Sequence, residues 1–167
     1  MELEQKKSEI EGFGKLTKLS RLAMGRMRDT VWAMDARRDN TDSLLARMND
    51  FLFDAFDHQE IEYKFDHSQV KKGTSIAPNI RQTIYLVFKE SVTNALKYST
   101  GTMIDITLRF DGKNFALTVH DNGSVDPSQM KTSGLGLSNM KARAEKVDAT
   151  FSINTAKGFS VQLEKNS

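Results

Sequence analysis

A pair of alternating segments joined by a tight turn constrains the fold of this chain more than any other feature. Apolar and polar residues alternate from Ile104 to Phe110 and again from Phe115 to Val119. Alternation with a period of two predicts strands that bury one face. Asp111-Gly112, which separates the two runs, is typical of a hairpin turn. The sequence therefore predicts an antiparallel hairpin in the second half of the chain.

Helical patterns lie on both sides of this hairpin. Apolar residues recur at helical spacing over residues 41–57, 78–98 and about 137–147. Thr41 or Asp42 is expected to cap the first of these helices. The second begins with proline, which a first helical turn tolerates.

Two further strand patterns complete a predicted sheet. Residues 60–65 alternate, and a last hairpin runs from Phe151 to Leu163 with its turn near residues 157–158. Residues 66–76 and 122–133 are expected to be polar loops. Five strands and three helices fit an α+β fold of two layers, with the helices on one face of a mixed, mainly antiparallel sheet.

Residues 2–35 are predicted to form one long amphipathic helix, because apolar residues recur there at three- and four-residue steps among many charged ones. Gly12 and Gly14 interrupt the pattern. Residues 37–40 are a predicted linker, so the chain divides into a helical segment, 1–38, and a domain, 41–165. The apolar stripe of so long a helix must pack against the domain or against a second copy of the chain.

Composition excludes several classes of function. The net charge is only +2 and the basic residues are scattered, so binding to nucleic acid is not expected. The chain has no cysteine, which excludes disulfides and thiolate metal sites. The charged N-terminus predicts no secretory leader, and no apolar run approaches the roughly 20 residues that span a bilayer.

Glu90, Asn94 and Lys97 are spaced to lie on one side of a helix. An amide oxygen such as that of Asn94 suits Mg²⁺, which prefers oxygen ligands. A neighbouring glutamate can orient a water molecule or accept a proton, and a lysine can meet phosphate as a point charge. The alternative is an ordinary solvated helix face.

Asp121-Asn122-Gly123 follows a predicted strand, and Gly134-Leu135-Gly136-Leu137 precedes a predicted helix. A carboxylate at a strand end can accept a hydrogen bond from the amino group of adenine, and glycines at a helix start expose N–H groups that bind anions. A turn aspartate and a flexible loop are the alternatives. Taken with the helical trio, the order and spacing favour a nucleotide pocket.

Residues 41–164 resemble the catalytic, ATP-binding domain of bacterial sensor histidine kinases. The segment Glu90-Ser-Val-Thr-Asn94-Ala-Leu-Lys97-Tyr98-Ser is similar to the N box of that family. Asp121-Asn-Gly123 is similar to its first glycine box, and Gly134-Leu-Gly136-Leu137-Ser-Asn-Met140 to its second. The resemblance implies the GHKL (Bergerat) fold, shared with DNA gyrase B, the MutL repair protein and the ninety-kilodalton heat-shock chaperone. Residues 27–35 resemble the second helix of the dimerisation and phosphotransfer hairpin in the subfamily of nitrate and desaturase sensors.

The resemblance also implies roles. Asp121 would bind adenine beside Gly123, Asn94 would hold Mg²⁺, and Glu90 would assist phosphoryl transfer. Residues 124–133 would form a short lid over ATP. The remaining contacts to ATP would come from Lys97, Tyr98, Val125, Gly134, Leu135, Gly136 and Leu137. Three positions depart from the family pattern, since Tyr98 replaces a histidine, Val125 a glycine and Phe159 a threonine.

The implied function is transfer of the γ-phosphoryl of ATP to a histidine on the first hairpin helix, and then to a response regulator. No histidine precedes residue 58, so this chain is not expected to phosphorylate itself. His120 precedes an acidic residue, as a phosphoacceptor does, but it belongs to the predicted nucleotide site and is rejected. The implied setting is a cytoplasmic domain of a membrane-anchored parent, with a homodimer through the N-terminal helix.

Two other functions remain open. An anti-sigma-factor serine kinase of the same superfamily would need no hairpin, and residues 27–35 disfavour it. A non-catalytic nucleotide-binding or dimerisation module is the second, and the departures at Val125 and Phe159 favour it.

Overall fold

The computed structural model describes residues 35–124 and 135–166, together with residues 12–14, 16, 17, 19, 20, 23–25, 27–29, 31 and 32. The chain divides into two compact units, Met1–Ala36 and Arg37–Ser167. Every described residue between 12 and 32 is helical, including Gly12 and Gly14. The predicted N-terminal helix is confirmed over these residues, and residues 2–11 lie outside the described ones.

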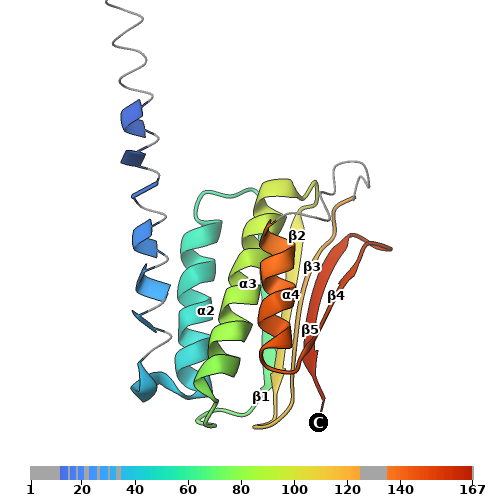
Figure 1. The fold of residues 1–167 in the computed structure, drawn as a ribbon. Coiled ribbons are helices and arrows are strands. Elements are labelled where there is room, and N and C mark those ends of the chain that lie inside the picture. The colour runs from blue at the N-terminus through green and yellow to red at the C-terminus, as the bar shows by residue number, and fades with distance from the viewer. Residues whose placement is uncertain are drawn as a thin grey trace, which may run out of the picture. The chain divides into compact units, whose positions relative to one another are not determined.

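The second unit follows the predicted order of helices and strands (Figure 1). A short 3-10 helix, η1 (Ala36–Arg38), stands at its boundary with the first unit. The elements that follow are α2 (Thr41–Phe56), β1 (Glu62–Val70), α3 (Pro78–Tyr98), β2 (Met103–Phe110), β3 (Phe115–Asp121), α4 (Leu135–Glu145), β4 (Thr150–Asn154) and β5 (Phe159–Lys165).

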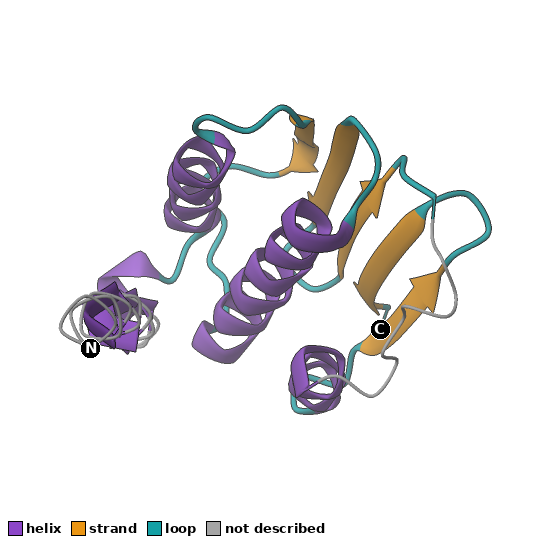
Figure 2. Cartoon of the chain, turned by 90° about the horizontal axis from the view of Figure 1, so that it is seen from above, coloured by secondary structure: helices purple, strands orange, loops and turns teal. Residues whose placement is uncertain are grey.

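The five strands form one sheet in the order β1-β2-β3-β5-β4. The edge pair β1–β2 is parallel, and the other three pairs are antiparallel. Helices α2, α3 and α4 all lie on one face of the sheet (Figure 2). The predicted two-layer α+β sandwich with a mixed, mainly antiparallel sheet is therefore confirmed.

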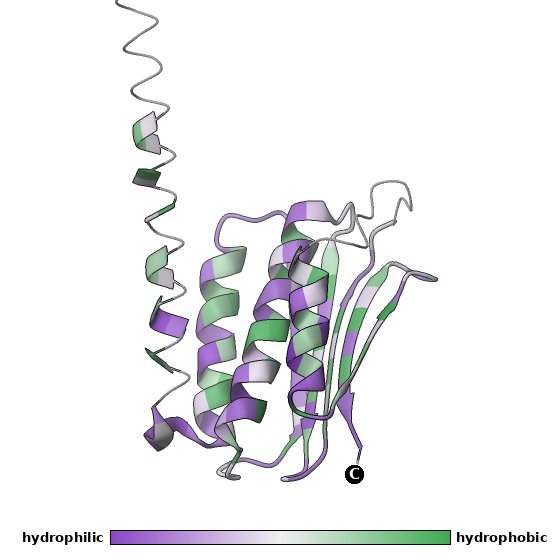
Figure 3. Ribbon diagram, viewed as in Figure 1, coloured by the Kyte–Doolittle hydropathy of each residue, from purple (hydrophilic) through white to green (hydrophobic). Residues whose placement is uncertain are grey.

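The faces predicted to be apolar form the core between the two layers. Ile84, Val87, Phe88 and Val92 of α3 are completely buried. The inward residues of β2 and β3 are buried as well, and along the elements hydrophobic positions are interspersed with hydrophilic ones (Figure 3). Full burial of such a side chain stabilises a fold by about 1.5–3 kcal/mol relative to exposure, so this layer supplies most of the driving force for folding.

The cap of α2 is one residue earlier than predicted. Ser43 N–H donates to Asn40 Oδ1 at 2.8 Å, so Asn40 is the N-cap and the expectation of Thr41 or Asp42 was wrong. The Thr41 hydroxyl is instead engaged with the loop after β1. It donates to Lys71 O at 2.9 Å and accepts from Thr74 N–H at 3.2 Å.

Strand β1 is longer than predicted. The expectation of a loop over residues 66–76 was wrong for residues 66–70, which continue the strand to Val70. Gln69 and Val70 pair with Arg109 and Phe110 after an irregularity that follows Asp66. An edge strand has one neighbour and can carry polar side chains, so its alternation fades before its hydrogen bonding ends. No described helix is long and apolar enough to cross a membrane.

Candidate functional site

Three predicted motifs converge at one end of the second unit. The C-terminal ends of α3 and β3 and the N-terminal end of α4 all lie at the upper end in Figure 1. Helices α3 and α4 also contact each other directly, because the Ser91 hydroxyl lies 3.5 Å from Met140 Sδ. Side chains far apart in the sequence therefore share one site.

Gly136 brings the start of α4 against two of the predicted residues on α3. A Cβ built on Gly136 would meet Glu90 Oε1 and would lie 3.7 Å from Asn94 Nδ2. Only glycine leaves room for the backbone to approach this closely. Glu90 and Asn94 are half-buried, so they belong to the junction between two helices and not to a fully solvated helix face.

Asp121, the last residue of β3, is 4% exposed. Its Oδ1 accepts two hydrogen bonds, from the Ser99 hydroxyl at 2.7 Å and from Gly123 N–H at 2.9 Å. Two donors on one oxygen fix the plane of a carboxylate. The Asp121 side chain is therefore held in one orientation by Ser99, which follows α3, and by Gly123, which follows β3.

Gly101 and Gly123 allow the turn after α3 to touch the end of β3. A Cβ on Gly123 would lie 2.6 Å from Gly101 N, and a Cβ on Gly101 would lie 2.5 Å from Gly123 N. Asn122 closes the same contact, because its Oδ1 accepts from the N–H groups of Thr102 and Met103 at 2.9 and 3.0 Å. This glycine contact places Ser99 beside Asp121.

Ser99 ends the first of the three motifs but has no predicted role, and Gly101 lies outside all of them. The signal that could have found them is a serine and a glycine in the short turn between a helix and a strand, where a hydroxyl and a close backbone approach are common. Asp121, the partner of Ser99, lies 22 residues further along the chain. Only the pairing of β2 with β3 brings the two segments together.

Lys97 and Tyr98 lie on the exposed end of α3. Lys97 Nζ stands 4.8 Å from the centre of the Tyr98 ring. A hydrogen bond with the Tyr98 side chain, with further contributions from the charges of Tyr98 and Glu90, raises the pKa of Lys97 above its ordinary value. Lys97 therefore remains a cation at neutral pH.

The remaining predicted site residues belong to the segment before α4 and to the first turn of that helix. Val125, Gly134 and the side chain of Leu135 lie outside the described residues, and Leu137 is half-buried on α4. Helix α4 begins at Leu135, two residues earlier than predicted. Within the described ranges, no three His, Asp or Glu side chains are grouped as a metal site.

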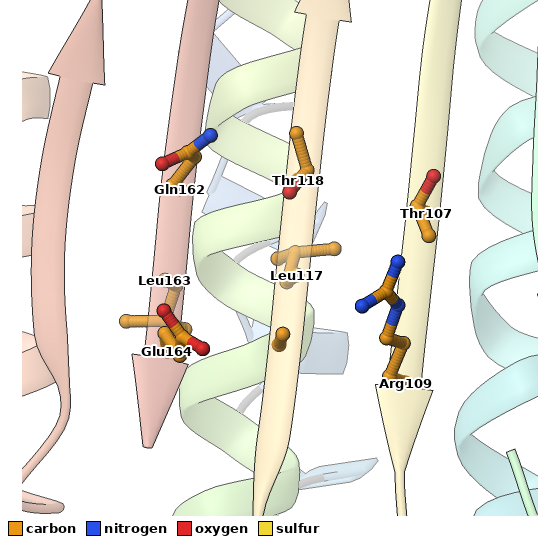
Figure 4. A pocket seen from close by; sticks show the side chains of 8 residues that line it. Thr107, Arg109, Leu117, Thr118, Gln162, Leu163 and Glu164 are labelled. Carbon is orange, nitrogen blue, oxygen red and sulfur yellow. The ribbon is translucent and has the colours of Figure 1, made fainter. Parts of the chain in front are cut away.

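A separate depression lies on the sheet face turned away from the helices (Figure 4). Its volume is about 260 Å³, and its lining comes from Thr107, Arg109, Ala116, Leu117, Thr118, Gln162, Leu163 and Glu164. Ala116 pairs with both Arg109 and Glu164, and its small side chain leaves the hollow between them. The depression contains none of the predicted site residues.

Residues 79–166 match the family of histidine kinase-, DNA gyrase B-, and HSP90-like ATPases. The matched segment makes up more than half of the 167 residues and contains every motif of the site. The chain belongs to this family. It carries the ATP-binding domain of this family.

The sensor histidine kinase YxjM of Bacillus subtilis is 32% identical over 88 residues, which is 52% of this chain and 21% of that protein. The chain thus spans about a fifth of this relative. The Acinetobacter baumannii histidine kinase AdeS matches with a TM-score of 0.63 and 14% identity, over 91% of this chain and 82% of that one. Full-length ShkA in complex with AMPPNP matches with a TM-score of 0.56 and 17% identity, over 72% and 28%. At these identities both structures show the fold alone.

Proposed function

We propose that residues 41–165 bind Mg-ATP and, in the complete protein, transfer its γ-phosphoryl group to a histidine on a hairpin helix absent from this chain. The observation that carries the proposal is the convergence of Asp121 with the Glu90–Asn94–Gly136 junction at one end of the domain. The oriented Asp121 carboxylate could accept a hydrogen bond from a nucleobase. The Asn94 amide lies beside the start of α4, where backbone N–H groups could bind a triphosphate. The base of one nucleotide would thus contact Asp121, and its triphosphate would contact the Glu90–Asn94–Gly136 junction.

The base would be read by Asp121. Its Oδ1 already accepts two hydrogen bonds, and none to Oδ2 is found within the ranges that the structure describes. Oδ2 would accept the amino hydrogen of adenine, while the backbone at Gly123 would lie along the ring. Burial strengthens such a hydrogen bond, because water cannot compete for the carboxylate.

The phosphates would lie at the start of α4. The backbone of residues 134–137 would donate N–H groups to them, and Lys97 and Tyr98 would approach from α3. Val125 would belong to the lid over the nucleotide. Positioning and charge neutralisation are the main tasks of a protein in phosphoryl transfer, and these groups supply both.

Asn94 fits the role of magnesium ligand, because it is half-buried beside Gly136 and offers the oxygen that Mg²⁺ prefers. When bound, Mg²⁺ neutralises phosphate charge. Glu90 would orient a water molecule of the ion or accept a proton from the attacking group. Its carboxylate touches the same glycine as Asn94, so both side chains would serve one end of the triphosphate.

The proposed partners follow from this role. A dimerisation and phosphotransfer domain would present the histidine, and a response regulator would receive the phosphoryl group. Phe13, Leu16 and Leu19 are at least 60% exposed on the N-terminal helix, which supports a homodimer through residues 1–38. The proposal also includes a parent protein that is anchored in a membrane and has this domain in the cytoplasm. It includes no nucleic-acid partner.

The proposal is tested by mixing the chain with a domain that carries the missing hairpin helix and with ATP labelled in its γ-phosphoryl group. Label should appear on histidine, as an acid-labile and alkali-stable phosphate. Glu90→Gln should slow the transfer by about 10²-fold or more. Arg109→Ala, on the opposite face of the sheet, is the matched control and should leave the rate unchanged.

The same experiment separates the two alternatives. Label on serine would support the anti-sigma-factor type of kinase, which the histidine kinase relatives disfavour. Tight binding of ATP with no label on any protein would support a non-catalytic module. The position of Phe159 directly opposite Asp121 in the sheet is the observation that keeps this second alternative in view.

A further inference from the structure

Two successive hydrogen bonds link the turn after α3 to Asp121, the carboxylate predicted to bind adenine. Gly101 N–H donates to the Ser99 hydroxyl oxygen at 2.9 Å, and that hydroxyl lies 2.7 Å from Asp121 Oδ1. A hydroxyl that accepts from a backbone N–H must direct its own hydrogen elsewhere. The Ser99 hydroxyl donates this hydrogen to Asp121 Oδ1.

The backbone around this chain leaves little room for change. Gly101 and Gly123 are in contact, and a Cβ on Gly123 would lie 2.7 Å from Ser99 Oγ and 2.9 Å from Asp121 Oδ1. The Asn122 amide fixes the turn from the other side through Thr102 and Met103. Ser99 is thus anchored at both of its hydrogen bonds before any ligand enters.

We infer that Ser99 is a positioning residue that sets the selectivity of the site for adenine. With Ser99 and Gly123 N–H occupying Oδ1, the carboxylate presents Oδ2 to the base in a fixed plane. Loss of the Ser99 hydroxyl leaves Oδ1 with the Gly123 bond alone, which permits rotation about χ2. The inference rests on the proposed function, because it assumes that Asp121 reads the 6-amino group.

The test measures Kd by calorimetry for ATP and for purine riboside triphosphate, which has hydrogen in place of the 6-amino group. Ser99→Ala should weaken ATP binding about 3- to 10-fold, the scale of one hydrogen bond. It should change the affinity for purine riboside triphosphate by less than about twofold, within the additivity limit of independent effects. Ser99→Thr keeps the hydroxyl on an extended backbone and should restore the selectivity for ATP.

A double variant makes the test independent of simple loss of packing. In the Asp121→Asn background, Ser99→Ala should have no further effect on ATP affinity, because the carboxylate oxygen that would accept from the amino group of adenine has been replaced by an amide nitrogen. Equal weakening of both nucleotides, or additive effects of the two substitutions, would overturn the inference. Should Ser99→Ala fail to fold, Ser99→Cys gives the same comparison with a near-isosteric but weak donor.

The outcome also separates this inference from the proposed function. If the wild-type chain binds ATP and Ser99→Ala binds it equally well, only the role of Ser99 is refuted. If the wild-type chain binds no nucleotide, both the proposed function and the inference are refuted.

Discussion

At the scale of single residues, the close approach of Gly136 to α3 has a direct consequence for Glu90. A Cβ at position 136 would meet the end of the Glu90 side chain and not its backbone. A carboxylate at the end of a flexible side chain can move aside at small cost. Glycine at position 136 therefore affects the position of the Glu90 carboxylate more than the stability of the fold.

Gly136→Ala should therefore leave the melting temperature nearly unchanged and slow phosphoryl transfer about 10- to 100-fold, because a displacement of about 1 Å in a positioned group has effects of this size. Transfer rates and thermal melts of the same sample measure the two effects. Lys141→Ala, exposed on the same helix, is the control. A full transfer rate in Gly136→Ala would show that Glu90 need not lie where the structure has it.

At the scale of elements, α3 is tied to the segment before α2 by a buried ion pair. Arg81 Nη2 lies 3.0 Å from Asp39 Oδ1, and the Arg81 side chain is completely buried. Ile76 N–H also donates to Asp39 O at 3.1 Å. Removing Arg81 would leave the half-buried Asp39 carboxylate without this partner and would empty a completely buried position.

Arg81→Ala should thus lower the free energy of unfolding by about 3–5 kcal/mol, measured by urea denaturation. Arg109→Ala, at an exposed position on β2, should stay within about 0.5 kcal/mol of the wild type. An equally small effect of Arg81→Ala would mean that the ion pair does not hold the start of the domain in place.

The turn between β2 and β3 is stabilised by Asp111, whose carboxylate accepts from Asn114 N–H at 2.7 Å and from Lys113 N–H at 2.9 Å. These hydrogen bonds lower the pKa of Asp111 below its ordinary value. A lowered folded-state pKa stabilises the fold above the unfolded value of 3.8, and this stabilisation is lost as the pH falls through the folded value.

Asp111→Ala should for this reason lower the urea midpoint at pH 7, and the difference from the wild type should shrink once the pH falls below about 4. Lys113→Ala is the control, since it keeps the backbone N–H that bonds to Asp111. A difference that stays constant down to pH 2.5 would argue against a role for the ionised carboxylate.

The sequence predicted the elements well and their ends less well. Period-two alternation located β2 and β3, because each buries one face against helices. It failed over Asp66–Val70, where hydrogen bonding to β2 decides the strand and Val70 is the one apolar residue. Asn40 replaced Thr41 as the cap for a similar reason, since the loop after β1 engages the Thr41 hydroxyl.

The candidate site was predictable as far as its motifs are local. Glu90 and Asn94 follow from helical spacing, and Asp121 from its place at a strand end. Ser99 and Gly101 depend on a contact that only the folded sheet creates, so no spacing rule could assign them. Residues 125–133 of the lid and Gly134 lie outside the described residues, and their roles remain predictions.

At the scale of the whole molecule, the apolar residues of the N-terminal helix predict association. Met27 and Val31 are 68% and 69% exposed, and among the described residues earlier on the helix Phe13, Leu16, Leu19 and Met24 are at least 60% exposed. Burying such a stripe against an identical one gains about 25 cal/mol per Å² of apolar surface. A second copy of the chain is the partner that the proposal assigns to it.

The mass in solution should accordingly be twice the 18.8 kDa of one chain. The combined substitution Leu16→Glu and Leu19→Glu should give a monomer, because charges would then have to enter the buried stripe. Phe53→Glu, at a position 76% exposed on α2, is the matched control and should remain a dimer. A monomeric wild type at high micromolar concentration would contradict the homodimer.

The central claim is that Asp121 selects an adenine nucleotide at this end of the domain, and a calorimetric titration with Mg-ATP tests it most directly. Asp121→Asn would keep its Oδ1 toward Ser99 and Gly123 and turn its amide N–H groups toward the amino group of adenine. The wild-type chain should bind one ATP, and Asp121→Asn should bind it about 10- to 100-fold more weakly, the scale of a lost charge-assisted hydrogen bond. No heat of binding at millimolar Mg-ATP, or equal affinity of the two proteins, would contradict the account.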